Sequence, residues 1–273
     1  MPFTVVRWML GVGLVGLLLT LLLLRGVVRR RTGDAKGAEA DLAAAFSPKT
    51  RAVLFNNPLN PSGIVYAREQ LELLAQFCVR SGAIAICDEV WEQVLFDGLA
   101  HKPLMAEPGM RDRCVKIGSA GKIFSLTGWK VGFVVAAPAL MKVLAKAHQF
   151  ITFTTPPNLQ TAVAYGLGKT DDYFETMRAS MMRSRDRFTQ GLIDCGFTVL
   201  PSEGTYFLAA DLTPLGIEDD VAFCHSMIEQ TGVAAIPMSA FYAQDPEKTT
   251  IRFCFAKKDE TLDAALEKLA RFI

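Results

Sequence analysis

The chain has 273 residues, of which 51% are hydrophobic, and a formal net charge of +1. This length allows one large domain or two smaller ones, with enough apolar residues for a core. Residues 1–36 hold six basic side chains and one acidic one, a net charge of +5, so the remainder carries −4. A slightly acidic body lacks the basic patch of a nucleic-acid-binding protein, and we expect no nucleic-acid partner.

Residues 8–24 form an uncharged segment of 17 residues between Arg7 and Arg25. This is at the short end of what spans a bilayer as a helix. The arginines at 29–31 would then hold the body on the cytoplasmic side. A second interpretation stays open, namely that these residues derive from a misassigned or frameshifted start. We therefore expect a cytoplasmic protein, or a membrane-anchored one with a cytoplasmic body.

After residue 39 the pattern alternates between short apolar runs and a helical repeat. Residues 51–55, 83–87 and 114–117 are typical of buried strands. Between the first two, Leu71, Leu74, Ala75 and Cys78 share one helical face, after a turn rich in proline and glycine. Strand, helix and strand in close succession indicate parallel crossovers and an α/β sheet.

The C-terminal part combines helices and strands in another order. We expect a long helical stretch over 159–192, strands at 206–209, 233–236 and 251–255, and a closing amphipathic helix with Leu262, Ala265, Leu266 and Leu269 on one face. This pattern is typical of an α+β subdomain. The six cysteines are dispersed and the three histidines lie far apart. We expect reduced structural thiols and no metal site.

Three segments carry the chemistry, and each follows a predicted strand. They are Asn56–Gly63 (NNPLNPSG), Cys87–Trp91 (CDEVW) and Ser119–Gly132 (SAGKIFSLTGWKVG). In this order they resemble the pyridoxal-phosphate-dependent aminotransferases of class I/II, which have the aspartate aminotransferase fold (fold type I). The resemblance covers residues 39–273 and lacks the usual N-terminal part of the family.

The resemblance implies an α/β fold and a homodimer. Residues 39–175 would form a partial large domain with a mostly parallel sheet, and residues 176–273 a C-terminal α+β small domain. Residues 1–38 would lie outside the family. The cofactor implied is pyridoxal 5'-phosphate, and the substrates implied are an amino acid and a 2-keto acid.

Residue roles follow from the same resemblance. Lys122 would bind the cofactor aldehyde and then act as the general base. Asp88 would face the pyridine nitrogen and keep it protonated. Asn60 would donate to the phenolic oxygen of the ring, and the Asn60–Pro61 bond would be cis.

Ser119 and Lys130 would hold the phosphate, and Arg252 would bind the substrate α-carboxylate with its bidentate fork. Two residues depart from the family pattern. Lys130 stands where many members have arginine, so a point charge replaces a fork. Trp91 stands where the family typically has tyrosine, and an indole N–H donates but does not accept.

The function implied is transamination by a ping-pong aldimine/ketimine mechanism. Two alternatives stay open. One is a non-catalytic remnant that binds no cofactor productively, because losing part of a parallel sheet exposes apolar surface. The other is β-elimination from cysteine conjugates, which uses the same residues and differs only in its products.

Overall fold

The computed structural model describes residues 35–242 and 246–273. The apolar segment at 8–24 lies outside these ranges. Within them, no helix combines the length and the apolar character needed to cross a membrane. The chain divides into two compact units.

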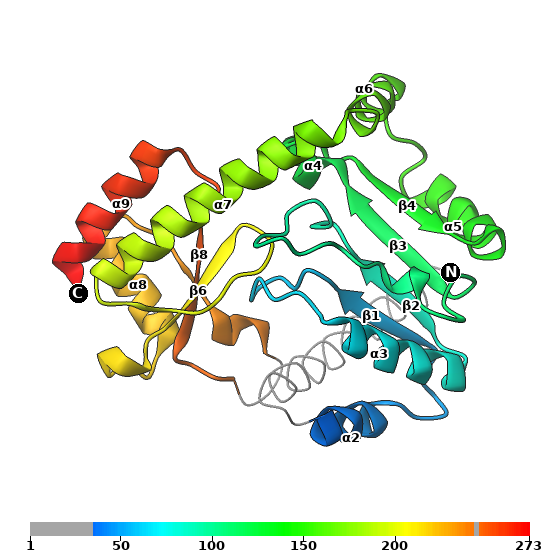
Figure 1. Ribbon diagram of the computed structural model, residues 1–273, viewed down its shortest axis with the longest axis horizontal. Helices are drawn as coiled ribbons and strands as arrows, with labels where there is room; N and C mark the ends of the chain where they lie inside the picture. The colour runs from blue at the N-terminus through cyan, green and yellow to red at the C-terminus, as the bar shows by residue number, and fades with distance from the viewer. Residues whose placement is uncertain (1–34, 243–245) are drawn as a thin grey trace. The chain divides into compact units, whose positions relative to one another are not determined.

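The first unit contains the described residues up to Asn57, with 66–92 and 101–169. Its sheet has the order β1-β2-β3-β4, in which β1, β2 and β3 pair in parallel and β4 pairs antiparallel with β3 (Figure 1). The predicted mostly parallel sheet is confirmed. Its elements are α2 (Ala35–Ala45), β1 (Ala52–Asn56), α3 (Arg68–Ser81), β2 (Ile84–Asp88), η1 (Leu104–Ala106), β3 (Cys114–Ser119), α4 (Ala120–Ile123), η2 (Thr127–Trp129), β4 (Gly132–Ala136), α5 (Pro138–Ile151) and α6 (Pro157–Leu167).

Helix α3 is the crossover between β1 and β2, as its repeat predicted. Leu71, Leu74, Ala75 and Cys78 are all buried. The helix ends at Gly82, whose left-handed backbone (φ 72°) suits a residue without a Cβ. The chain then enters β2 parallel to β1, so Asp88, the last residue of β2, lies opposite Asn56 at the end of β1.

The second unit contains residues 58–65, 93–100 and those from Thr170 onward. All pairings in its sheet, of order β5-β6-β8-β7, are antiparallel. This α+β arrangement agrees with the predicted small domain. Its elements are α7 (Asp171–Asp194), β5 (Thr198–Val199), β6 (Phe207–Asp211), η3 (Thr213–Leu215), α8 (Asp220–Thr231), β7 (Ile236–Pro237), η4 (Met238–Phe241), β8 (Thr250–Cys254) and α9 (Asp259–Phe272).

The structure corrects the predicted helix over 159–192. The segment forms two helices, α6 and α7, separated at residues 168–170. Gly168 caps α6, and Thr170 precedes α7 with an extended backbone. Glycine has a low helix propensity, which favours an interruption here. The predicted strand at 233–236 is also shorter, because only Ile236 and Pro237 pair with β8.

The two units differ from the predicted division at residue 175. Residues 170–175 belong to the second unit, as do the loops 58–65 and 93–100. Main-chain hydrogen bonds explain the loops. The Gly63 carbonyl accepts from the Glu203 and Gly204 amides at 2.8 and 2.9 Å, and Leu95 forms a β-bridge with Gly204. Pairing between residues so distant in sequence is not visible in the local pattern.

Candidate active site

The first element of the site is the carboxyl end of β2, where Asp88 lies. The Asp88 carbonyl accepts hydrogen bonds from the Asn57 amide (3.1 Å) and from Asn56 Nδ2 (2.8 Å). Its Oδ1 accepts one from the Val90 amide at 3.4 Å. Burial raises the pKa of the Asp88 carboxyl, while the Val90 amide and the charge of Lys122 act in the opposite direction. A desolvated carboxyl of this kind favours a cationic or N–H partner.

The second element is the end of β3, which leads from Ser119 straight into α4. Gly121 accepts hydrogen bonds at its carbonyl from the Leu126 amide (3.0 Å) and from Thr127 Oγ1 (3.2 Å). A Cβ at Gly121 would lie 3.0 Å from the Thr127 Cα. The segment therefore folds back tightly on itself, which explains the glycine directly before Lys122.

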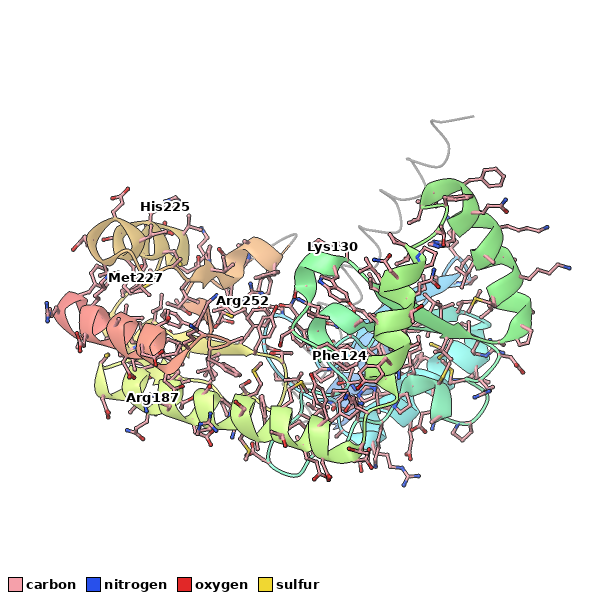
Figure 2. All side chains as sticks on the ribbon, turned by 90° about the horizontal axis from the view of Figure 1, so that it is seen from above. Phe124, Lys130, Arg187, His225, Met227 and Arg252 are labelled. Atoms are coloured by element: carbon pink, nitrogen blue, oxygen red, sulfur yellow. The ribbon has the colours of Figure 1, made fainter. Side chains whose placement is uncertain are left out.

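Apolar packing holds this folded-back segment in place. Ala120, Val131 and Val163 form a buried cluster, against which Phe124 and Leu159 pack. A Cβ at Gly166 of α6 would lie 2.8 Å from the Phe124 ring. Phe124 lies in the first unit (Figure 2). The packing of α6 thus fixes both flanks of Lys122.

Lys122 and Trp91 bring the two elements together. Lys122 Nζ lies 4.8 Å from the centroid of the Trp91 ring. Trp91 is 2% exposed, so the ring is a fixed surface for the ammonium group. Asp88 ends β2 and Trp91 lies in the turn after it, whereas Lys122 belongs to α4, and the charge of Lys122 acts on Asp88. Three of the residues predicted from the sequence therefore form one cluster.

The predicted phosphate ligands are placed less closely. Ser119 is half-buried, and its hydroxyl does not cap α4. Lys130 follows η2 with a left-handed backbone (φ 56°) and is exposed (Figure 2). In the described part of the chain Lys130 takes part in no hydrogen bond or ion pair that would hold its side chain. Its predicted role stays a prediction.

The remaining two predicted residues lie together in the second unit. Arg252 Nη1 donates a hydrogen bond of 2.7 Å to Asn60 Oδ1. The Arg252 guanidinium lies 4.0 Å from the centroid of Phe207 and 5.1 Å from that of Phe241. Burial lowers the pKa of Arg252, although an arginine stays protonated in proteins. A partly desolvated guanidinium between aromatic faces is suited to bind a carboxylate. The Asn60–Pro61 bond is cis, as predicted.

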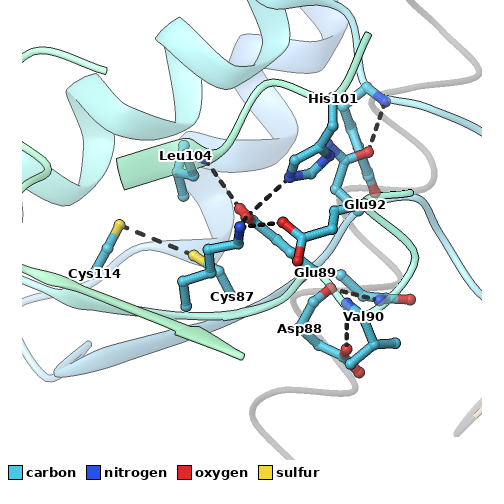
Figure 3. A network of polar contacts seen from close by, with 12 residues as sticks. Cys87, Asp88, Glu89, Val90, Glu92, His101, Leu104 and Cys114 are labelled. Carbon is cyan, nitrogen blue, oxygen red and sulfur yellow. Dashed lines mark hydrogen bonds and ion pairs between the residues drawn. The ribbon is translucent and has the colours of Figure 1, made fainter. Parts of the chain in front are cut away.

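One group of polar residues was not predicted from the sequence. No role was expected for His101, yet its Nε2 lies 3.0 Å from Oε2 of Glu89, which is fully buried (Figure 3). The signal available was Glu89 itself, a charged residue directly after a buried strand. The partner twelve residues away could not be identified from spacing.

Comparisons with known proteins identify the family to which the chain belongs. A family model described as aminotransferase class I and II matches residues 26–269. The chain therefore belongs to the class I and II aminotransferases, a family that uses pyridoxal phosphate. The match begins ahead of residue 39 and so includes positions that the motifs alone left outside the resemblance.

Individual relatives support the same family. The solved N-succinyldiaminopimelate aminotransferase of Mycobacterium tuberculosis is 39% identical, with a TM-score of 0.83, over 86% of this chain and 62% of that one. Kynurenine–oxoglutarate transaminase 1 of Rattus norvegicus is 37% identical, over 85% of this chain and 60% of its own. Methionine aminotransferase of Escherichia coli is 36% identical, over 89% and 64% respectively. The chain thus spans about three-fifths of the length of these relatives.

Proposed function

We propose that this chain binds pyridoxal 5'-phosphate and transfers an amino group between an amino acid and a 2-keto acid. The observation that carries the proposal is the cluster of Lys122, Trp91 and Asp88 at the ends of two neighbouring parallel strands. Open α/β sheets bind ligands at the carboxyl ends of their strands. A lysine beside a desolvated carboxyl is the donor set that an aldehyde-bearing pyridine requires.

The residues present fit the cofactor. The half-buried Asp88 carboxyl, with its raised pKa, would gain a partner in a pyridinium N–H. Lys122 would bond the aldehyde, Ser119 and Lys130 would hold the phosphate, and Trp91 and Asn60 would contact the ring or its phenolic oxygen. When bound, the cofactor supplies an electron sink for the substrate Cα.

The chain's own side chains supply the remaining chemistry. Lys122, as a free amine, would remove and return the proton at the substrate Cα. Arg252 would bind the α-carboxylate and so orient the Cα–H bond. The keto acid formed from the donor leaves before the acceptor enters, which is the ping-pong order.

The test is covalent trapping. Borohydride treatment of the chain with pyridoxal phosphate is expected to leave a pyridoxyl group on Lys122, detected by peptide mass. In Lys122→Ala we expect no adduct at that site and a loss of transamination of at least about 10³-fold, because both the covalent link and the base are removed. Lys142→Ala, at an exposed lysine of α5, is the matched control. Transamination retained by Lys122→Ala would refute the assignment.

A non-catalytic role is the second candidate, and it applies if the apolar surface of the first unit is left uncovered by a partner. Large apolar side chains are exposed in β4, α5, α6 and the segments between them: Val134, Val135, Val143, Phe150, Ile151, Phe153, Tyr165 and Leu167. Protein that is folded yet binds no pyridoxal phosphate would support this candidate. The visible absorbance of the protein after addition of pyridoxal phosphate distinguishes the catalytic from the non-catalytic candidate.

The partners and location also stay proposals. We infer a homodimer from family membership, and the exposed apolar side chains of α5 and α6 support an association surface. We propose a cytoplasmic body, with membrane attachment only if residues 8–24 form an anchor. Sedimentation of the purified chain tests the oligomeric state.

A further inference from the structure

A buried charged cluster lies directly behind Asp88, and the proposed chemistry does not use it. Glu89 has no exposed surface. Its Oε1 accepts a hydrogen bond from the Leu104 amide at 3.1 Å, and its Oε2 lies 3.0 Å from His101 Nε2 and 3.9 Å from Lys116 Nζ (Figure 3). Lys116 also forms an ion pair with Glu92. Burying a carboxylate is strongly unfavourable unless the carboxylate is paired, so the burial of Glu89 depends on these contacts.

The backbone links this cluster to the active site. Asp88 ends β2, and the Glu89 amide donates to the Ile117 carbonyl at 3.0 Å, which continues the ladder with β3. Side chains of successive residues in extended backbone point to opposite faces. Holding the Glu89 side chain in the interior therefore fixes the direction of the Asp88 side chain.

The same cluster also controls the turn that carries Trp91. The Glu92 amide donates to the Glu89 carbonyl at 3.1 Å and closes this turn. Glu89 and Glu92, at its two ends, both face Lys116. Lys116 belongs to β3, the strand that leads to Ser119 and Lys122. The ammonium of Lys116 thus ties the turn with Asp88 and Trp91 to the strand that presents Lys122.

His101 is one of the three contacts of the Glu89 carboxylate, and its second nitrogen indicates the direction of the hydrogen bond. Nδ1 is buried and has no hydrogen-bond partner among the described residues. A tautomer with a proton on Nδ1 would leave a buried N–H unpaired, which is unfavourable. The tautomer that donates Nε2–H to Glu89 avoids this cost, so His101 acts as a fixed donor.

We propose that Glu89 is a positioning residue, which, held by His101 and Lys116, fixes the turn that presents Asp88 and Trp91 to Lys122. Glu89 touches neither substrate nor cofactor in this role. The inference rests on the proposed function for its consequence in catalysis, but the geometry it concerns exists in the ligand-free chain.

The principal test compares two Glu→Gln changes. Glu89→Gln keeps the shape of the side chain and removes its charge, and its amide N–H would compete with the His101 donor. The control is Glu72→Gln on α3, which breaks the exposed ion pair with Arg68 (2.7 Å) in the same unit. We expect Glu89→Gln to lower kcat by about 10- to 100-fold, because small misplacements near reacting groups have effects of this size. Glu72→Gln is expected to match the parent chain.

Two measurements on ligand-free protein separate positioning from a loss of folding. The Asp88 carboxyl pKa, followed by NMR, is expected to fall toward its ordinary value in Glu89→Gln, because the repulsion from Glu89 is removed and water gains access. The Trp91 indole resonance, assigned with Trp91→Phe, is expected to shift. If neither changes in folded Glu89→Gln, the inference is wrong.

A second pair of variants serves if Glu89→Gln does not fold. In His101→Gln, the side-chain amide can donate to Glu89 from nearly the same position as Nε2, whereas His101→Leu cannot. We expect His101→Gln to retain the parental Trp91 resonance and His101→Leu to shift it. Identical spectra in the two variants would overturn the inference. If the parent chain binds no pyridoxal phosphate, the proposed function fails, while these ligand-free measurements still decide the role of Glu89.

Discussion

Helices α5 and α9 have the same length, 14 residues, but only one of them is covered. Leu262 and Leu269 of α9 are buried within the second unit, where α9 packs on α7. No residue of α5 is buried, and Phe150 near its end is 87% exposed. The apolar residues of both helices gather on one face. The comparison shows that an apolar face indicates a need for a partner without indicating which one the fold supplies.

The largest expected effect compares a covered with an uncovered apolar side chain, by the same substitution in the second and the first unit. Phe253 of β8 is 2% exposed, with its ring centroid 5.8 Å from that of Phe188 and 5.7 Å from that of Phe197. Phe253→Ala is expected to lower the free energy of unfolding by about 3–5 kcal/mol. Phe150→Ala is expected to change it by less than about 0.5 kcal/mol, as at an exposed site. Urea unfolding measures both.

The variant Phe150→Ala can also contradict the comparison between α5 and α9. A loss of several kcal/mol in Phe150→Ala would mean that α5 is covered in solution. Concentration dependence of that loss would identify a second copy of the chain as the cover.

A smaller effect is expected from the ion pair between Asp97 and Arg185 in the second unit. Arg185 Nη1 and Nη2 lie 2.6 and 2.9 Å from the two Asp97 oxygens, and the Arg185 side chain is largely buried. We expect Asp97→Asn to cost about 1 kcal/mol, because the exposed Asp97 is screened by solvent. The hydrogen bond from Arg185 lowers the pKa of Asp97. This contribution is therefore present above the ordinary aspartate pKa and is lost as pH falls through the lowered value.

The smallest effect is a pH dependence of opposite sign in the first unit. Burial raises the pKa of Asp88, so the folded chain binds a proton more tightly than the unfolded chain does. The Asp88 contribution to stability should fall as pH rises from the ordinary aspartate pKa through the raised one. Asp88→Asn should remove this slope, and Asp112→Asn, at an exposed residue, should keep it. Unfolding curves of ligand-free protein across this pH range measure the difference, and a slope unchanged in Asp88→Asn would contradict the assigned burial.

The local sequence was enough to predict those elements whose structure depends on their own residues. The helical face of α3, the three parallel strands and the order of the motifs were readable because side-chain periodicity and strand-end polarity are local properties. The Lys122, Asp88 and Arg252 assignments came from residue types in a family pattern. The contact of Lys122 with Trp91 and the hydrogen bond from Arg252 to Asn60 required the structure, since Arg252 and Asn60 are 192 residues apart.

Tertiary structure decided what depends on partners distant in the chain. The sequence shows Glu89 only as a charged residue after a strand. The tertiary structure places His101 and Lys116 beside it, and these partners compensate for the burial of its carboxylate. In the same way, α5 and α9 are both amphipathic in sequence, and only the fold covers one of them. Whether a side chain is buried or paired depends on its neighbours. Those neighbours come from segments distant in the chain, and no local sequence pattern predicts which segments come into contact.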